Sequence, residues 1–417
     1  MSYYLLTQTY NPNIYKNIFF KKVENEESNQ KTLISFSLYD NLCKFKKQIE
    51  NNYDHWDNIK KYTNPYEFIH TLIPNQKISI SKMKTLSRSF YKMIELCKIF
   101  KIFEKWEDKE INTFHLAEGP GGFIEASVYL RNNKNDNYYG MTLVNDDPGC
   151  PGWRKSKLFL DNNSNVNIIY GEDNNGDLLS LENFKYCYKR WKNKMELITG
   201  DGGIDVSSDF NKQEKLVSKL IIAELMYAIV MQKEGGSYIL KIFDIFSKLT
   251  LDILFILSNL YEEVYIVKPY TSRLANSEKY IYCNNFLLED SEKFYEVFIN
   301  NFEKLNNYDN IETILDINFD YYFLNRIEEI NAILGQQQLE NIINTINVIN
   351  NRNNFEKLES MKKNNIQKCI VWCEKYDIPF NKIYLSNNIF LNNTNNSAPT
   401  FNFSSLQNKN IVENSNE

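Results

Sequence analysis

From residue 113 onward, short apolar runs alternate with longer stretches in which apolar residues recur every three or four positions. Five runs are too short for a helix and predict strands, at residues 113–117, 138–143, 166–170, 195–199 and 237–243. Helical spacing follows at residue 123 onward, 212–233 and 249–261. Because strands that alternate with helices join through right-handed crossovers, this pattern predicts an α/β fold with a mostly parallel sheet.

Two last apolar runs, at residues 264–267 and 280–283, are close enough in sequence to pair as a hairpin. They would bring the sheet to seven strands and give it an antiparallel edge. Helices on both faces would cover this sheet.

The segments on either side of this region follow other patterns. Residues 1–77 have no clean period and are predicted to form an N-terminal extension that carries a cap- or RNA-binding element. The alternating region, 78–290, opens with helical spacing up to residue 106. Residues 291–386 are predicted to be helical, with a break near 350–354, and the Asn/Ser-rich residues 387–417 to be a disordered tail.

Composition narrows the class of protein. The chain has 417 residues, 43% of them hydrophobic, so it can bury a core, and its net charge of −5 argues against nonspecific coating of nucleic acid. A local basic track runs from Lys77 to Lys101 against one acid, Glu95; a solvated helix face explains it equally well. We expect no membrane segment, no secretory signal and no metal site, hence a soluble intracellular protein.

A glycine-rich loop follows the first predicted strand, at Glu118–Phe123. Such a turn lets a ligand approach the backbone at the carboxyl end of a parallel strand. The dinucleotide fingerprint is broken because Ile124 stands where a glycine is needed, and no phosphate-binding P-loop pattern is present. Taken alone, the loop is equally well explained as a structural turn.

Four polar residues occupy positions that an ordinary core would fill with apolar ones. Asp201 follows the fourth strand, Lys241 lies near the end of the fifth, Glu278 precedes the last, and Lys92 lies in the segment before the domain. Burying such groups is costly unless they are paired. Each one alone is more simply explained as a structural ion pair or a surface charge.

Together these motifs resemble the FtsJ-like (RrmJ-type) methyltransferase family, and in particular its branch that methylates the ribose of mRNA caps. The similarity covers roughly residues 85–285 and also extends to probable FtsJ-type methyltransferases of large cytoplasmic DNA viruses. It rests on five segments in the family's order: 87–93, 118–123, 201–203, 235–241 and 268–280. Ser87, where cap enzymes commonly have Asn, departs from the pattern.

The resemblance implies a Rossmann-like fold that binds S-adenosyl-L-methionine, a methyltransferase domain at 78–290, and a catalytic Lys-Asp-Lys-Glu tetrad formed by Lys92, Asp201, Lys241 and Glu278. In this reading Lys241 is the general base for a ribose 2′-hydroxyl, with a pKa lowered by burial and by Lys92. Asp201 would orient Lys241, and Glu278 would hold one of the lysines.

The resemblance also implies ligand-binding residues. The methyl donor would be bound by Glu118, Gly119, Pro120, Gly121, Gly122, Phe123, Asp177 and Asp201. The loops Asn145–Asp147 and Asp173–Asp177 are both candidates for its ribose and adenine, with Asp177 preferred for the adenine. RNA would be bound by Arg88, Arg273 and Asn276.

The implied substrate is RNA, preferably capped mRNA, and other capping or transcription factors are candidate partners. Tyr138, Trp153 and Trp56 are candidates for stacking on a cap guanine, and the sequence does not choose among them. The alternatives are 2′-O-methylation of ribosomal or other structured RNA, a methyltransferase-like RNA-binding subunit without activity, and a dehydrogenase on the same fold.

Overall fold

The structure, a computed structural model, describes residues 1–23, 34–145, 147, 150–203 and 210–382. Residues 1–381 form one compact unit, so the predicted boundaries at 77 and 290 fall inside it. An eight-stranded sheet has the order β1-β8-β9-β7-β6-β3-β4-β5. Its strands are β1 Ser2–Leu5, β3 Asn112–Leu116, β4 Asn137–Met141, β5 Val166–Ile169, β6 Met195–Gly200, β7 Gln232–Ile242, β8 Tyr261–Lys268 and β9 Lys279–Phe286.

The seven predicted strands are all present, and the mostly parallel sheet is confirmed. Strands β5, β4, β3, β6 and β7 are parallel neighbours, and β9 lies antiparallel between β7 and β8. The eighth strand is β1, which pairs antiparallel with β8 so that Ser2 lies opposite Lys268. The extension therefore completes an edge that would otherwise expose unpaired backbone groups.

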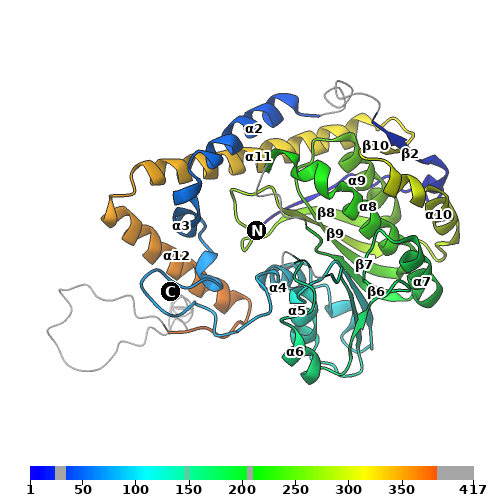
Figure 1. The fold of residues 1–417 in the computed structure, drawn as a ribbon, viewed down its shortest axis with the longest axis horizontal. Helices are drawn as coiled ribbons and strands as arrows, with labels where there is room; N and C mark the ends of the chain where they lie inside the picture. Colours follow the sequence, from blue (N-terminus) through cyan, green and yellow to red (C-terminus); the bar gives the residue numbers. More distant parts are fainter. Residues whose placement is uncertain (24–33, 146, 148–149, 204–209, 383–417) are drawn as a thin grey trace, which may run out of the picture. The chain divides into compact units, whose positions relative to one another are not determined.

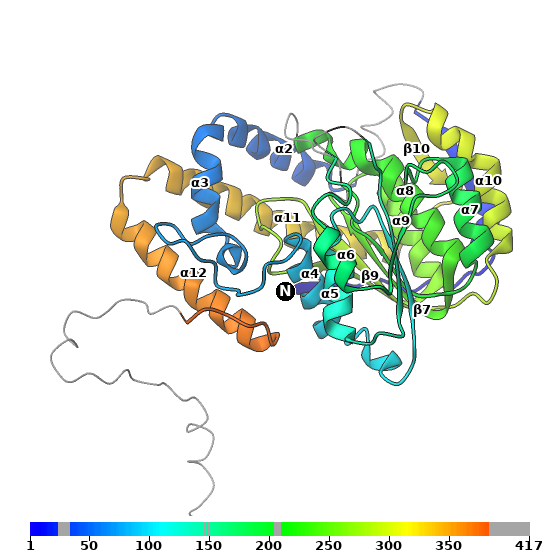
Figure 2. The same cartoon turned by 60° about the horizontal axis from the view of Figure 1, so that its bottom comes forward.

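Helices cover both faces of the sheet, with α4, α5 and α6 on one side and α7, α8 and α9 on the other (Figure 1, Figure 2). Their bounds are α4 Ser89–Ile99, α5 Gly122–Arg131, α6 Lys157–Asn162, α7 Leu181–Trp191, α8 Gln213–Met231 and α9 Lys248–Leu260. Helix α8 is apolar around most of its circumference because its second half is buried on every side.

The helix predicted from residue 78 begins only at Ser89. The preceding backbone is bonded to distant segments instead, since Ile80 N–H donates to Phe68 O and Lys82 N–H donates to Pro379 O. These long-range bonds satisfy the backbone groups that a helix would otherwise pair, so tertiary contacts override the local pattern.

The two extensions pack together on the α/β core. Helix α11 (Tyr321–Asn350) runs along α2 (Phe36–Glu50) and α3 (Tyr53–Thr63), and α12 (Phe355–Lys375) contacts α3 (Figure 1). The break predicted near 350–354 is confirmed between α11 and α12.

The C-terminal region is not purely helical, however. After α10 (Glu292–Asn307), β10 (Ile311–Leu315) pairs with β2 (Ile18–Lys22) of the other extension. The remaining short helices are the 3₁₀ turns η1 Ile14–Asn17, η2 Glu67–Ile69, η3 Glu104–Trp106 and η4 Phe210–Lys212. The predicted tail, 387–417, lies outside the described residues. Within the described part of the chain, every helix is too short or too polar to cross a membrane.

Candidate active site

The fold brings the four predicted tetrad residues to one edge of the sheet. Asp201 directly follows β6 and Lys241 is the penultimate residue of β7, so both lie where parallel strands end. Strand β9 runs the opposite way, which places Glu278, just before its first residue, at the same edge. Lys92 comes from α4, which packs against α5 next to the glycine-rich loop. In parallel α/β sheets this edge is where ligands bind.

The tetrad forms two ion pairs. Lys92 Nζ lies 2.8 Å from Glu278 Oε2, and Lys241 Nζ lies 3.2 Å from Asp201 Oδ1 while donating to the Asp201 carbonyl at 2.6 Å. Tyr280 donates its hydroxyl to Asp201 Oδ1 at 2.9 Å and lies opposite Lys241 in the strand register. All four charged side chains are only 11–13% exposed, so water screens them weakly.

The two lysines differ in electrostatics. Burial lowers the pKa of Lys92. The negative charge of Glu278 raises this pKa and the positive charge of Lys241 lowers it, and the pKa stays below its ordinary value. Burial also lowers the pKa of Lys241, but Asp201, Glu278 and Glu224 outweigh it, so the pKa lies above its ordinary value. The expected lowering of the Lys241 pKa is therefore wrong for the site as it stands, because its nearest charges are carboxylates.

Glu278 keeps its charge in this setting. Burial raises its pKa, but Lys92, Lys241 and Lys268 outweigh burial and hold the pKa far below its ordinary value. Its Oε1 atom is buried and has no hydrogen-bond partner among the described residues. A buried carboxylate oxygen of this kind can accept a hydrogen bond from a ligand.

Lys268 supports the segment that carries Glu278, and the sequence analysis assigned it no role. Its ammonium donates to Asn276 O at 2.8 Å, Asn276 Oδ1 at 2.9 Å and Glu278 O at 2.7 Å. These bonds fix the backbone on both sides of Ser277. The signal was a lysine at the end of an apolar strand, the same signal that marked Lys241.

Glu224 is a second residue that the sequence analysis missed. It is fully buried in α8, accepts the Gly202 N–H at 3.0 Å, and so holds the turn that positions Asp201. Burial raises its pKa to about 8. Its signal was an acid within an otherwise apolar helical run.

The glycine-rich loop connects β3 to α5. The Glu118 side chain accepts the N–H groups of Phe123 at 2.7 Å and Ile124 at 3.2 Å, which satisfies two free donors at the helix start. Gly121 has a φ of 109°, a conformation open mainly to glycine. The Phe123 side chain is fully buried, so only the backbone of this residue can approach the methyl donor.

The loop also packs closely on its neighbours. A Cβ atom on Gly119 would lie 2.8 Å from Gly152 O, and one on Gly122 would lie 2.1 Å from Ser89 Oγ. Pro120 O accepts a hydrogen bond from Ser156. These contacts are structural, so part of the glycine content serves packing.

One feature of the loop fits the positively charged methyl donor that the sequence predicts. Glu118 Oε2 is buried without a hydrogen-bond partner among the described residues. Burial, together with the charge of Asp201, raises the Glu118 pKa well above its ordinary value. A cation nearby would lower the raised pKa, and an ammonium group could also donate a hydrogen bond to Oε2.

The loops predicted to bind the rest of the donor are only partly described. Asp177 Oδ1 accepts the Leu179 N–H at 2.9 Å, which leaves its Oδ2 for other contacts. The preceding Gly176 fits tightly under Thr142 O, beside the end of β4. Asp146 lies outside the described residues. No group of three or more His, Cys, Asp or Glu side chains in the described ranges is placed to hold a metal.

The predicted RNA-binding residues are held by other protein groups. Arg88 Nη1 lies 3.0 Å from Glu67 Oε2, and Arg273 donates to both Glu67 oxygens at 2.7 and 3.0 Å. Arg88 also donates to Thr271 O, and Asn276 accepts from Lys268 as described. The structure thus places both arginines beside the tetrad edge but links them through one buried acid of the N-terminal extension.

The three aromatic residues proposed to stack on a cap guanine differ in burial, since Tyr138 is buried and Trp153 and Trp56 are half-buried. Tyr138 is fully buried and donates to Asp136 at 3.0 Å. Trp153 packs in the cluster of Ile124, Tyr138 and Val166, and Trp56 packs against Ile59 and neighbouring α11 residues. A buried ring cannot stack on a base, so Tyr138 in particular is excluded.

The profile of the FtsJ-like methyltransferase family matches residues 85–286. The cap-specific mRNA (nucleoside-2′-O-)-methyltransferase of Autographa californica nuclear polyhedrosis virus is 32% identical over 235 residues, which cover 53% of this chain and 84% of that protein. The chain belongs to the FtsJ-like methyltransferase family. The Rossmann-like methyltransferase fold predicted from the sequence is thereby confirmed.

Two further relatives of this FtsJ-like protein carry similar names. Cap-specific mRNA (nucleoside-2′-O-)-methyltransferase 1 of Trypanosoma brucei brucei is 35% identical over 185 residues, covering 42% of this chain and 48% of the relative. Cap-specific mRNA (nucleoside-2′-O-)-methyltransferase 2 of Drosophila melanogaster is 27% identical over 219 residues, covering 49% and 31%. The chain thus spans less than half of the length of each of these two relatives.

Proposed function

We propose that this protein transfers the methyl group of S-adenosyl-L-methionine to a ribose 2′-oxygen of RNA, next to the mRNA cap. The observation that carries the proposal is the pair of buried ion pairs, Lys92–Glu278 and Lys241–Asp201, at the carboxyl edge of a methyltransferase sheet. The relatives named for cap-specific 2′-O-methylation support the choice of substrate.

The chemistry requires a 2′-hydroxyl to lose its proton as its oxygen attacks a methyl group. Bound S-adenosyl-L-methionine supplies that methyl group on a positively charged sulfur. Lys241 is the proposed base, which requires that its amine be neutral when the hydroxyl reacts. Because Asp201 holds Lys241 charged in the site as described, a positive charge beside Asp201 would weaken that interaction and favour the neutral amine.

The other groups position the reactants. Lys92, held by Glu278, lies close enough to Lys241 for the two cations to interact, and it can donate a hydrogen bond to the reacting oxygen. The carboxylates of Glu118 and Asp201 are proposed to bind the positive charges of the methyl donor. The Gly119–Gly122 backbone and Asp177 are proposed to bind the rest of the donor. Arg88, Arg273 and Asn276 are proposed to line the path of the RNA. Fixing the reactants in this way lowers the barrier mainly through orientation.

Transfer of a labelled methyl group to short RNAs tests the proposal. Capped and uncapped transcripts of one sequence would be compared, together with capped RNAs already 2′-O-methylated at the first or second nucleotide. We expect transfer to capped RNA that one of the methylated controls blocks. Equal transfer to uncapped RNA would point to structured RNA as the substrate, and donor binding without any transfer would point to an inactive RNA-binding subunit.

A further inference from the structure

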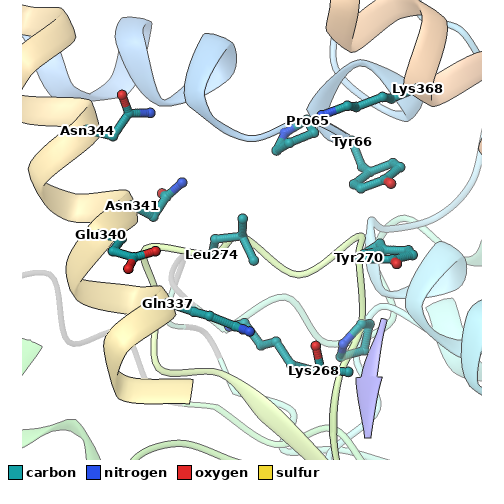
Figure 3. A pocket seen from close by; sticks show the side chains of 12 residues that line it. Pro65, Tyr66, Lys268, Tyr270, Leu274, Gln337, Glu340, Asn341, Asn344 and Lys368 are labelled. Carbon is teal, nitrogen blue, oxygen red and sulfur yellow. The ribbon is translucent and has the colours of Figure 1, made fainter. Parts of the chain in front are cut away.

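The structure contains a cavity of about 470 Å³ beyond the tetrad, at the end of β8 (Figure 3). This volume lies within the range of about 300–1,000 Å³ that small-ligand pockets occupy. The 268–274 segment forms one wall, and the N-terminal extension, α11 and α12 form the others. Two thirds of the lining residues therefore lie outside the segment matched by the family profile, residues 85–286.

One end of the cavity is an aromatic platform. The rings of Tyr66 and Tyr270 stack with centroids 4.9 Å apart and an interplanar angle of 22°. Tyr270 is 43% exposed, so part of its ring is accessible, and Pro65, Pro269 and Leu274 extend the apolar surface beside it. An accessible ring in a stack is the surface on which an unpaired nucleobase binds.

The opposite wall is polar and belongs to α11. Gln337, Glu340 and Asn344 line the cavity and face the tyrosine pair across it (Figure 3). Asn341 donates to Thr63 O at 3.2 Å, and its Oδ1 has no partner among the described residues. Amide and carboxylate groups of this kind bond the edge of a base whose face is stacked.

The cavity is also coupled to the active site through the backbone. Lys268 and Tyr270 line it, and the same loop continues to Arg273 and Glu278. Glu95, fully buried, fixes this loop by accepting the Tyr270 N–H at 2.7 Å and the Thr271 N–H at 3.1 Å. A group bound on Tyr270 is therefore held by a rigid segment that leads directly to the tetrad.

We propose that this cavity binds one unpaired base of the RNA substrate, stacked on Tyr270 with its edge toward α11. The proposal rests on the proposed function, since it assumes that RNA reaches the tetrad edge. A base bound here would fix the number of nucleotides between its own nucleotide and the one whose ribose is methylated.

Binding of abasic RNAs tests the proposal. Fluorescence anisotropy would give the affinity of a capped eight-nucleotide RNA, of its uncapped form, and of a series in which each nucleotide in turn lacks its base. For the unmodified protein we expect one position, or the cap, to lose about 5- to 100-fold in affinity when its base is removed. Tyr270→Ala should weaken binding of the intact RNA by a similar factor. In this variant, removing the base at the sensitive position should cause no further loss of affinity.

Control variants separate the ring from its surroundings. Tyr270→Phe keeps the ring and should bind as the unmodified protein does. Tyr322→Ala removes an α11 tyrosine that is 80% exposed and does not line the cavity, and it should keep the full abasic pattern. If Tyr270→Ala folds poorly, Asn344→Trp fills the cavity from the other wall and should give the same loss.

The proposal is overturned if Tyr270→Ala and Asn344→Trp bind the intact RNA as the unmodified protein does, or if both retain the full abasic penalty. Failure of the proposed function has another signature, because the unmodified protein would then show either no methyl transfer or equal transfer to capped and uncapped RNA. If the uncapped RNA shows the loss, the anchored base is the cap guanine; a loss at an internal position identifies a nucleotide of the transcript.

Discussion

The link between Glu67 and the two arginines gives the most quantitative prediction. Glu67 lies in η2 of the N-terminal extension, its side chain is 1% exposed, and it is bonded to Arg88 and Arg273. Glu67→Gln keeps the shape of the side chain but removes the charge that both arginines share. Two partly buried cations would then lack a carboxylate.

The expected cost can be estimated from this geometry. Breaking a buried ion pair by removing one partner destabilises by about 3–5 kcal/mol. Arg88 and Arg273 are 21% and 33% exposed, so water replaces part of the lost interaction and the lower end applies, about 3 kcal/mol. Burial raises the pKa of Glu67, but the hydrogen bond and charges of the arginines outweigh it and hold the pKa below its ordinary value.

Urea unfolding measures this cost. The free energy of unfolding of Glu67→Gln should lie about 3 kcal/mol below that of the unmodified protein at pH 7. Because a lowered carboxyl pKa stabilises the folded state only above it, the difference should shrink as the pH falls through the folded-state pKa. Glu329→Gln is the matched control, since it breaks an exposed pair with Arg326 and should cost less than about 1 kcal/mol. An equally small cost for Glu67→Gln would refute the reasoning.

Three further changes test the site. Lys268→Met removes the donor to three acceptors around the tetrad glutamate, so single-turnover methyl transfer should fall about tenfold or more while donor affinity, measured by titration, stays within about twofold. Gly176→Ala would place a Cβ atom 1.9 Å from Thr142 O at a φ of 67°, and thermal unfolding should show a loss of about 2 kcal/mol or more; an unchanged melting curve would contradict the geometry. Asp201→Asn removes the largest charge that raises the Lys241 pKa, so the rising limb of the pH–rate profile should move to lower pH, and an unmoved limb would exclude Lys241 as the titrating group.

Much of the fold follows from local patterns. Each strand from β3 to β9 was predicted because it is a short apolar run between helical stretches, and this order fixes the parallel arrangement. The resemblance to the FtsJ-like family implied that the four tetrad residues form one site, and the structure brings them to one edge of the sheet. By contrast, β1 lies in a stretch without a clean apolar period and β10 in a stretch predicted to be helical, and both form by pairing with distant strands.

The electrostatics of the site could not be predicted in the same way. Whether the pKa of Lys241 rises or falls depends on the sum of burial and three carboxylates, and Glu224, one of these, comes from a helix read only as apolar. Arg88 and Arg273 lie near the tetrad, but their common partner Glu67 lies in a segment without a recognisable pattern. Such long-range pairs depend on the packed structure rather than on local spacing.

The central claim is that the methyl group reaches a ribose 2′-oxygen, and the most direct test is to locate it in the product. Capped RNA methylated by the protein with labelled S-adenosyl-L-methionine would be digested to nucleosides and separated by mass spectrometry. The account predicts that the label appears in a 2′-O-methylated nucleoside, that it disappears when the target nucleotide is 2′-deoxy, and that it is lost with Lys241→Ala. Label on a base, or undiminished transfer to the 2′-deoxy RNA, would contradict it.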